Sequence, residues 1–311
     1  MRRGVGDCTS LRSLPIVSLQ TFDKGMSRSV PPNRVGHVIG ARYEVLSLLG
    51  EGGQSAVYRA RDRRAGDEVA LKILKPETSP EATERMFREA RAMATLHGTA
   101  AVRVLDQQWT EDGAMCLVTE LLAGEPLDEA LTSAETNGGR AEISWISGLI
   151  EPVVVTLQAA HGMGIVHRDL KPANIFVMSG GRGVRLLDFG FAKFTRLRGL
   201  TADGMVAGSP SYIAPETWQG RHDVIDHRID VYALGAVLFR CVGGKAPFAS
   251  KDLTQMLREV TRAPRPSLHA LRPELSPDID DWVTHALAVD PEHRFQSVTA
   301  LFRAFQHCVS R

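Results

Sequence analysis

The chain has 311 residues, of which 43% are hydrophobic and 23% charged, and its formal net charge is +1. This length suits one large core or two lobes, and the composition is that of an ordinary globular protein rather than a disordered or fibrous one. A charge so near zero gives no reason to expect nucleic acid or an anionic membrane as the main partner.

The four cysteines are scattered and form no Cys-x-x-Cys pair, which favours reduced thiols in a cytoplasmic protein over disulfides or a zinc site. No apolar run approaches the roughly 18 residues of a membrane helix, because the two longest, 150–160 and 231–242, are short and contain polar residues or glycine. We therefore predict a cytoplasmic protein with no membrane span and no secretory signal.

The first segment, residues 1–38, mixes serine, arginine, proline and glycine without a helix or strand period. This pattern predicts a disordered leader. The chain could start at Met1 or at Met26, and the sequence alone does not decide between them.

The next part, residues 39–122, alternates in the manner of strands. Strands are predicted over 43–49, 56–61, 68–74, 102–109 and 114–121, with a glycine-rich turn at 50–55. A helix over 80–97 places its apolar residues on one side. These elements predict a small lobe of five strands and one helix.

The remainder, residues 123–311, becomes mostly helical after Gly124. Helices are predicted over 144–161, 229–242, 278–289 and 298–309, and short strands over 175–178 and 184–187. The helix 229–242 is apolar nearly all round, so we expect it to be buried at the centre. The whole chain is predicted to be an α+β protein of two lobes.

The most informative segment is 167–174, His-Arg-Asp-Leu-Lys-Pro-Ala-Asn, followed by Asp-Phe-Gly at 188–190. Such groups can hold a phosphoryl group, its metal ions and an attacking hydroxyl together. Asp169 would accept or orient the proton of the hydroxyl, and Lys171 would neutralise charge on the phosphoryl group. Asn174 and Asp188 offer oxygen ligands to magnesium.

Two further features are weaker by themselves. Glycines in the turn 50–55 let backbone amides approach phosphates, but glycine-rich hairpins are common. Lys72 stands in a strand, where an ordinary solvated lysine is the alternative to one held toward nucleotide phosphates by Glu89. Because no helix directly follows the turn, a dinucleotide-binding fold is disfavoured.

Taken in order, these motifs resemble the eukaryotic-type serine/threonine protein kinases, and most of all their bacterial branch. The resemblance covers about residues 40–310 and includes Gly-Ser-Pro at 208–210, Ala-Pro-Glu at 214–216, the segment 230–235 and Arg294. It implies a two-lobed protein kinase fold, with the lobes at about 39–122 and 123–311.

The resemblance also implies roles for particular residues. ATP would be bound by Gly50, Glu51, Gly52, Gly53, Gln54, Ser55, Ala56, Val57, Ala70, Lys72, Glu89, Thr119, Glu120, Leu122 and Phe176. A hydrophobic spine joining the lobes would contain Met93, Leu105, His167 and Phe189, anchored by Asp230. Glu216 and Arg294 would form a buried ion pair. Thr195 and Thr201 are candidate phosphorylation sites that could pair with Arg168, although ordinary exposed threonines are the alternative.

Few positions depart from the family pattern. Ser55 replaces the third glycine of the turn but keeps its backbone N–H, and Ser209 replaces a threonine but keeps the hydroxyl. Gly98 stands after His97, at a position where the family commonly has a proline. None of these changes removes a catalytic group.

The expected function is transfer of the γ-phosphoryl group of ATP to serine or threonine in proteins, with Mg2+, or alternatively Mn2+, as the metal. The chain would also phosphorylate its own activation segment, which runs between Asp188 and Glu216, with a homodimer as one route for reaction in trans. One alternative is a pseudokinase that acts as a scaffold, which would lack some of Lys72, Asp169, Asn174 and Asp188. The other is a small-molecule phosphotransferase, which would lack the Ala214–Glu216 and Arg294 features.

Overall fold

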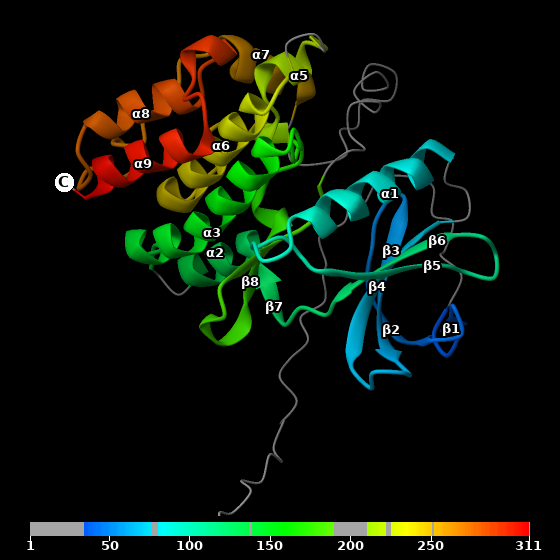
Figure 1. Cartoon of the computed structure of the whole chain (residues 1–311). Coiled ribbons are helices and arrows are strands. Elements are labelled where there is room, and N and C mark those ends of the chain that lie inside the picture. Colours follow the sequence, from blue (N-terminus) through cyan, green and yellow to red (C-terminus); the bar gives the residue numbers. More distant parts are fainter. Residues whose placement is uncertain are drawn as a thin grey trace, which may run out of the picture.

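The computed structural model describes residues 34–75, 80–136, 139–189, 210–221, 225–250 and 252–310. A small lobe built on a sheet and a larger helical lobe stand side by side (Figure 1). Most of the predicted leader lies outside the described residues. Its last residues, 34–38, contact the small lobe, where Arg34 forms an ion pair of 2.6 Å with Asp112.

The small lobe contains a six-stranded antiparallel sheet in the order β1-β2-β3-β4-β6-β5. Its strands are β1 (Val38–Ile39), β2 (Tyr43–Glu51), β3 (Ser55–Asp62), β4 (Glu68–Leu74), β5 (Val104–Trp109) and β6 (Met115–Glu120). The prediction of five strands missed β1, because a two-residue strand carries too little sequence pattern to be recognised.

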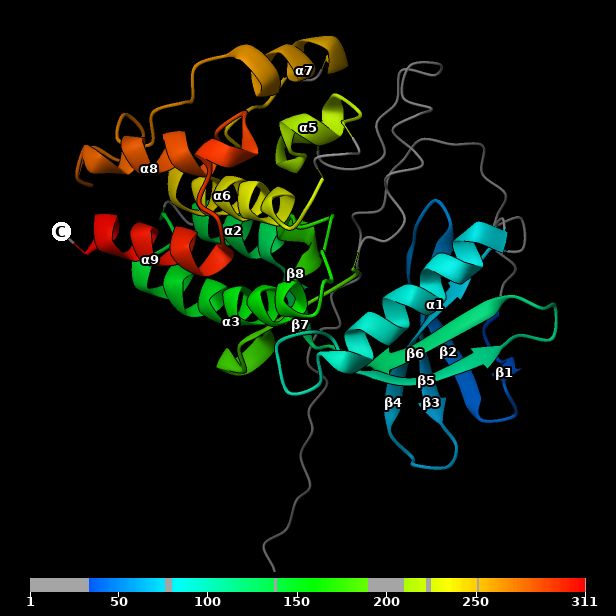
Figure 2. The same cartoon turned by 45° about the horizontal axis from the view of Figure 1, so that its top comes forward.

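The two faces of this sheet have different neighbours because side chains alternate along each strand. On one face, buried residues such as Tyr58, Leu71 and Val118 form a separate small core. On the other face, the helix α1 (Pro80–Thr95) packs against β5 and β6 (Figure 2) and buries Met86 and Met93.

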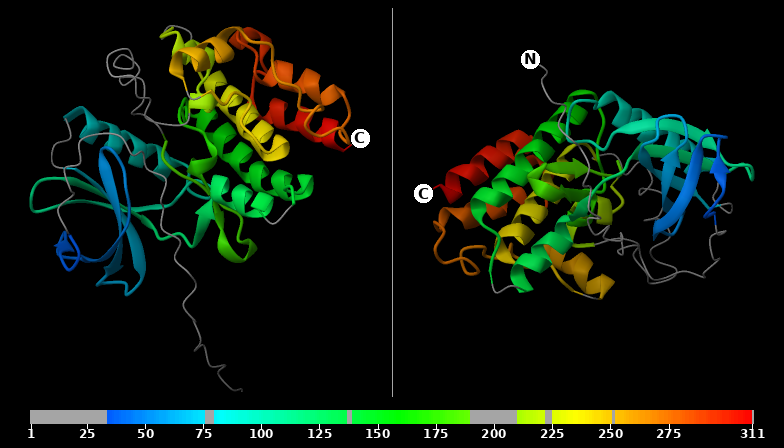
Figure 3. Two further views of the ribbon diagram at one scale, coloured as in Figure 1. Left: turned by 180° about the vertical axis from the view of Figure 1, so that it is seen from behind. Right: turned by 90° about the horizontal axis from the view of Figure 1, so that it is seen from below.

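The larger lobe is mostly helical (Figure 3). In the part of this lobe that the structure describes, the helices are α2 (Leu127–Thr136), α3 (Ile143–Gly162), α5 (Pro215–Trp218), α6 (Arg228–Gly243), α7 (Leu253–Arg262), α8 (Asp278–Ala286) and α9 (Val298–Val309). Short 3-10 turns occur at Pro172–Asn174, Ser179–Gly181, Pro210–Tyr212 and Pro291–His293. A small antiparallel sheet, β7 (Gly124–Pro126), β8 (Ile175–Met178) and β9 (Val184–Leu186), lies beside the first of these turns.

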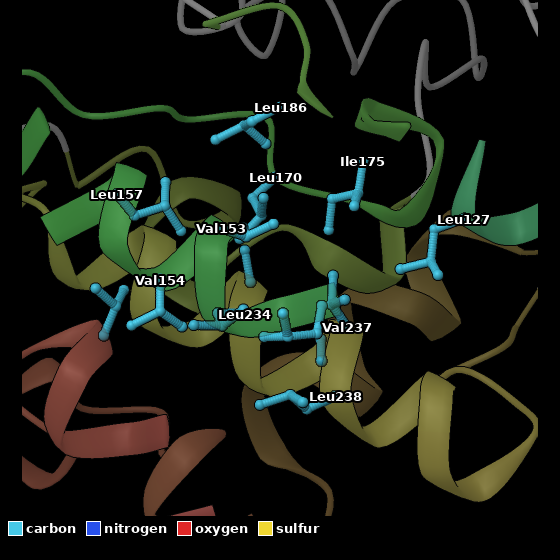
Figure 4. Close-up of a cluster of buried hydrophobic side chains, with 14 of the residues drawn as sticks. Leu127, Val153, Val154, Leu157, Leu170, Ile175, Leu186, Leu234, Val237 and Leu238 are labelled. Atoms are coloured by element: carbon cyan, nitrogen blue, oxygen red, sulfur yellow. The ribbon is translucent and has the colours of Figure 1, made fainter. Parts of the chain in front are cut away.

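The predicted central helix, α6, is buried along almost its whole length and packs against α3, α8 and α9. Leu234, Val237 and Leu238 of α6 lie in the same apolar cluster as Val153 and Leu157 of α3 (Figure 4). Leu170, Ile175 and Leu186 belong to the same cluster. Its apolar contacts therefore fix the positions of the segments that carry the candidate site.

Helix α3 has 20 residues and is long and apolar enough, by length and composition alone, to cross a membrane. The expectation that no apolar run approaches that length was therefore wrong. Its buried face, which includes Ile150 and Val153, packs in the core of the lobe against α6 and α9. The core of a folded lobe thus explains the apolar character of this helix.

The segment that follows α1 is bonded to the larger lobe. The Val102 amide donates to the Leu186 carbonyl at 3.0 Å, and the Leu186 amide donates to the Ala100 carbonyl at 2.7 Å. The Ala100 amide donates to Oγ1 of Thr156 on α3 at 2.9 Å. Residues 100–102 therefore belong to the small lobe in sequence and to the larger lobe in their hydrogen bonds.

Candidate active site

The predicted catalytic segment, residues 167–174, is held in place by the carboxylate of Asp230 on the central helix α6. Asp230 accepts hydrogen bonds from the backbone amides of His167 and Arg168, each at 2.8 Å, and lies 2.8 Å from Nε2 of His161. Burial alone would raise the pKa of Asp230, but the hydrogen bond and the charge of His161 lower it below its ordinary value. The carboxylate is therefore ionised and fixes the backbone at Arg168, whose φ is +68°.

His167 packs as a structural residue. It is fully buried, and its ring centroid lies 4.7 Å from that of Phe189. Its Nε2 lies 2.9 Å from the Leu187 carbonyl, while its Nδ1 accepts from the Asp169 amide at 3.3 Å. Burial lowers the pKa of His167, so the ring is neutral with its proton on Nε2.

Asp169 contacts two other predicted catalytic and metal-binding residues, Asn174 and Lys171. Nδ2 of Asn174 donates to the Asp169 carbonyl at 2.7 Å and to Oδ2 of Asp169 at 3.0 Å. Nζ of Lys171 lies 3.5 Å from the same Oδ2. Because the amide nitrogen of Asn174 is used in this way, its amide oxygen is the atom left to bind a cation.

A lysine of the small lobe connects three elements. Nζ of Lys72 on β4 donates to Glu89 of α1 at 3.0 Å and to Asp188, which follows β9, at 2.7 Å. Asp188 has a φ of +45°, a conformation that residues other than glycine rarely adopt. The predicted pair of Lys72 and Glu89 is thus present in the structure, and Asp188 completes a triad.

The charges of this triad depend on one another. Burial would lower the pKa of Lys72, but Asp188 and Glu89 raise it above its ordinary value. Burial and the negative charge of Asp188 raise the pKa of Glu89. Burial acts to raise the pKa of Asp188, but the positive charge of Lys72 outweighs this effect and lowers that pKa below its ordinary value.

The donor atoms fit a small hard cation. Asp188 contributes an ionised carboxylate and Asn174 an amide oxygen, which are ligands that magnesium accepts. Within the described residues, no three histidine, cysteine, aspartate or glutamate side chains gather in a way that could hold a metal ion. A cation here would therefore draw further ligands from bound phosphates, as magnesium commonly does.

The predicted nucleotide-binding residues lie around Lys72. The turn between β2 and β3 is closed by a hydrogen bond of 2.7 Å from the Gly52 amide to the Ser55 carbonyl. Val57 is the register partner of Lys72, and Thr119 is the partner of Ala70, so all four side chains share one face of the sheet.

The remaining nucleotide-binding candidates come from the strand that leads into the larger lobe and from that lobe. Oε1 of Glu120 accepts from Nε of Arg185 and from the Arg103 amide, both at 2.9 Å, and the Glu120 amide donates to the Arg103 carbonyl at 3.0 Å. Both the side chain and the backbone of Glu120 are therefore bonded within the fold. Leu122 is partly buried and packs against the apolar cluster that contains α3 and α6, and Phe176 on β8 is buried. The candidate phosphorylation sites Thr195 and Thr201, with Gly190 and Ser209, lie outside the described residues.

The expected ion pair of the larger lobe is present and buried. Arg294 donates to the two carboxylate oxygens of Glu216 at 2.7 and 2.6 Å, and the two side chains are 0% and 1% exposed. The same guanidinium donates to the carbonyls of Ala288, Val289 and Arg228. All five of its N–H groups are thus used.

One predicted spine residue was wrong. Leu105 is 43% exposed, whereas Met93, His167 and Phe189 are buried. A β-bulge between Val104 and Asp106 shifts the register of β5 and turns Leu105 outward. Its neighbour Val104 packs against the main core instead.

Some contributors were not singled out from the sequence. His161 stands six residues before His167, a spacing that gives no sign of a contact with Asp230. Arg185 and Thr156 are equally silent in a single sequence, because their partners are distant along the chain.

The two lobes, the Lys72 triad between them and the catalytic segment held by Asp230 are the arrangement of a protein kinase. Residues 43–307 match the family model described as the protein kinase domain. The chain therefore belongs to the protein kinase family.

Several bacterial proteins are similar over most of this chain. It is 38% identical over 271 residues to the serine/threonine-protein kinase PknA of Mycobacterium tuberculosis, covering 85% of this chain and 60% of PknA. It is 36% identical over 290 residues to the serine/threonine-protein kinase pkn3 of Myxococcus xanthus, covering 89% of this chain and 51% of the relative. The chain thus spans about half the length of these curated relatives.

Among solved structures, the kinase domain of PknI from Mycobacterium tuberculosis is similar. The TM-score is 0.68 at 25% sequence identity, and the match covers 88% of this chain and 98% of that domain. The similarity confirms the two-lobed kinase fold that the sequence motifs predicted.

Proposed function

We propose that this chain is a serine/threonine protein kinase that transfers the γ-phosphoryl group of ATP to proteins. The observation that carries the proposal is the Lys72 ammonium, bonded to Glu89 and Asp188 at 3.0 and 2.7 Å. Asp169, Lys171 and Asn174 form a second connected group in the catalytic segment of the larger lobe.

Each residue has a separate task in this reaction. The ammonium group of Lys72 would hold the phosphates of the nucleotide, and Glu89 would keep that group directed toward them. Asp169 accepts or orients the proton of the serine or threonine hydroxyl, and Lys171 neutralises charge on the phosphoryl group. Asn174 and Asp188 would hold magnesium, or manganese in its place, and the bound ion would neutralise charge on the nucleotide oxygens.

The pseudokinase alternative is less well supported. A scaffold has no need of all four polar groups of the reaction, yet Lys72, Asp169, Asn174 and Asp188 are all present and each contacts another member of its group. The small-molecule phosphotransferase is disfavoured by the buried pair of Glu216 and Arg294, which belongs to the segment that would dock a polypeptide.

The acceptor preference is argued from the catalytic segment and the relatives. Lys171 is the feature of that segment that favours serine and threonine over tyrosine, and both curated relatives are named serine/threonine kinases. We further propose a cytoplasmic enzyme that acts on proteins rather than on nucleic acid or at a membrane. Its own targets would be Thr195 or Thr201, modified in trans within a homodimer.

The experiment is a phosphorylation assay with radiolabelled ATP, magnesium and a general protein acceptor. Asp169→Asn and Lys72→Met are each expected to lower labelling by at least about a hundredfold, because each removes a group that acts on the reacting centre. The control is Arg59→Met, which breaks a partly exposed ion pair with Glu68 elsewhere on the sheet. A wild-type chain that binds ATP but labels no acceptor would favour the scaffold.

A further inference from the structure

A lysine outside the predicted site joins the glycine-rich turn to the strand that carries Lys72. Nζ of Lys75 donates to Oε1 of Glu51 at 2.6 Å, and the backbone amide of Lys75 donates to the Gln54 carbonyl at 2.9 Å. The Lys75 side chain is 16% exposed and that of Glu51 37%. Lys75 therefore contacts the turn through both its side chain and its backbone.

The connection crosses one intervening strand. Glu51 is the last residue of β2, Lys75 directly follows β4, and β3 lies between these strands. Neighbouring strands are about 4.8 Å apart, so the end strands of this trio are beyond the reach of backbone hydrogen bonds to each other. The side chains of Glu51 and Lys75 bridge these two strands beside the turn between β2 and β3.

The charge of Glu51 makes this bridge relevant to phosphate binding. The register places the Glu51 side chain with Ala56 and Ile73, on the face of the sheet opposite Lys72. Its carboxylate would therefore repel the phosphates of a nucleotide at the turn through its charge and without direct contact. An ammonium at 2.6 Å cancels that charge. Because Lys72 stands three residues before Lys75, the same strand also fixes the position of the turn relative to Lys72.

We propose that Lys75 is a positioning residue for the nucleotide, which neutralises Glu51 and holds the glycine-rich turn in register with Lys72. This inference rests on the proposed function, since it requires a nucleotide at the turn. The ion pair of Arg59 and Glu68 gives a matched comparison, because it joins β3 to β4 at 2.6 Å but makes no contact with the turn.

The test measures the Kd for ATP with magnesium by calorimetry, together with KM and kcat. Lys75→Met is expected to raise both Kd and KM for ATP about tenfold while kcat changes less than about twofold, because the interaction concerns binding and not the transferred group. Arg59→Met should leave all three unchanged, and Lys75→Arg should restore most of the affinity.

The partner is tested by the double variant Glu51→Gln with Lys75→Met. If Lys75 acts by neutralising Glu51, removing both charges recovers at least half of the lost affinity, on a logarithmic scale. An unchanged Kd in Lys75→Met, or a double variant as weak as the single one, overturns the inference.

These outcomes separate the inference from the function on which it rests. If the wild-type chain binds ATP but transfers no phosphoryl group, catalysis is refuted while the Kd series still decides the role of Lys75. If the wild-type chain binds no nucleotide, both proposals fall. If transfer is normal and Lys75→Met has no effect on Kd, this inference alone falls.

Discussion

The pair of Glu216 and Arg294 offers the sharpest test of how the larger lobe is held together. In Arg294→Met, the Glu216 carboxylate would lose both of its charged donors at a site where its side chain is 1% exposed. Three backbone carbonyls, those of Ala288, Val289 and Arg228, would lose a donor at the same time.

The expected loss of unfolding free energy depends on the Glu216 carboxylate, which is left buried and without its cationic partner. Removing one member of a buried ion pair leaves an uncompensated charge and destabilises a protein by about 3–5 kcal/mol. An exposed pair contributes at most about 1 kcal/mol. Glu292 is the matched comparison, because it bonds Arg228 at 2.8 Å but is 72% exposed.

The assay is urea unfolding followed by circular dichroism, with Arg294→Met, Glu292→Gln and the double variant Glu216→Met with Arg294→Met. The first should lose about 3–5 kcal/mol and the second less than about 1 kcal/mol. The double variant should be more stable than Arg294→Met by at least about 1 kcal/mol, since no charge is left unpaired. Equal losses in Arg294→Met and Glu292→Gln would refute the reasoning.

Three more predictions concern stability. The pKa of Asp230 is lower in the folded chain than the value of about 3.9 in the unfolded chain, so its ionised form stabilises the fold fully above about pH 3.9. This stabilisation is lost as the pH falls from there through the lower pKa of the folded chain. Urea titrations at about pH 5 and pH 3 should therefore show a smaller loss in Asp230→Asn than in the wild type; equal losses would contradict this. Met93→Ala should lower the unfolding free energy by about 2–5 kcal/mol and Leu105→Ala by less than about 1 kcal/mol, and a reversed order would restore Leu105 to the spine. Gly235→Ala should cost about 1–3 kcal/mol in thermal unfolding, because its Cβ would lie 2.9 Å from that of Ala286, and an unchanged Tm would show that α6 and α8 can separate freely.

The sequence was most informative where a local pattern determines the structure. The strands β4 and β8 and the helix α9 have the predicted bounds, since alternation and helical periodicity are properties of consecutive residues. The helices α2 and α7 were not resolved individually. On α2 only three residues are buried, so its apolar signal is weak. On α7 the apolar residues Leu253, Met256, Leu257 and Val260 recur at helical spacing, and this signal was overlooked.

The site was predicted in its residue types but not in its connections. Lys72 and Glu89 were paired correctly from the sequence, because the family motifs fix which helix follows which strand. The exposure of Leu105 could not be predicted, since a single extra residue in β5 shifts its register without changing the apolar pattern. The contact of Lys75 with Glu51 was missed for another reason: a lysine at a strand end is almost always solvated.

The hydrogen bonds of residues 100–102 change what counts as a separable piece of this molecule. A fragment cut at residue 122 would contain the whole sheet of the small lobe, yet it would leave the Ala100 amide and the Val102 amide without their acceptors on Thr156 and Leu186. Its partner fragment would lose a donor and an acceptor for Leu186. The two lobes are thus distinct in shape but share one stretch of backbone pairing, so we expect them to unfold as one cooperative unit.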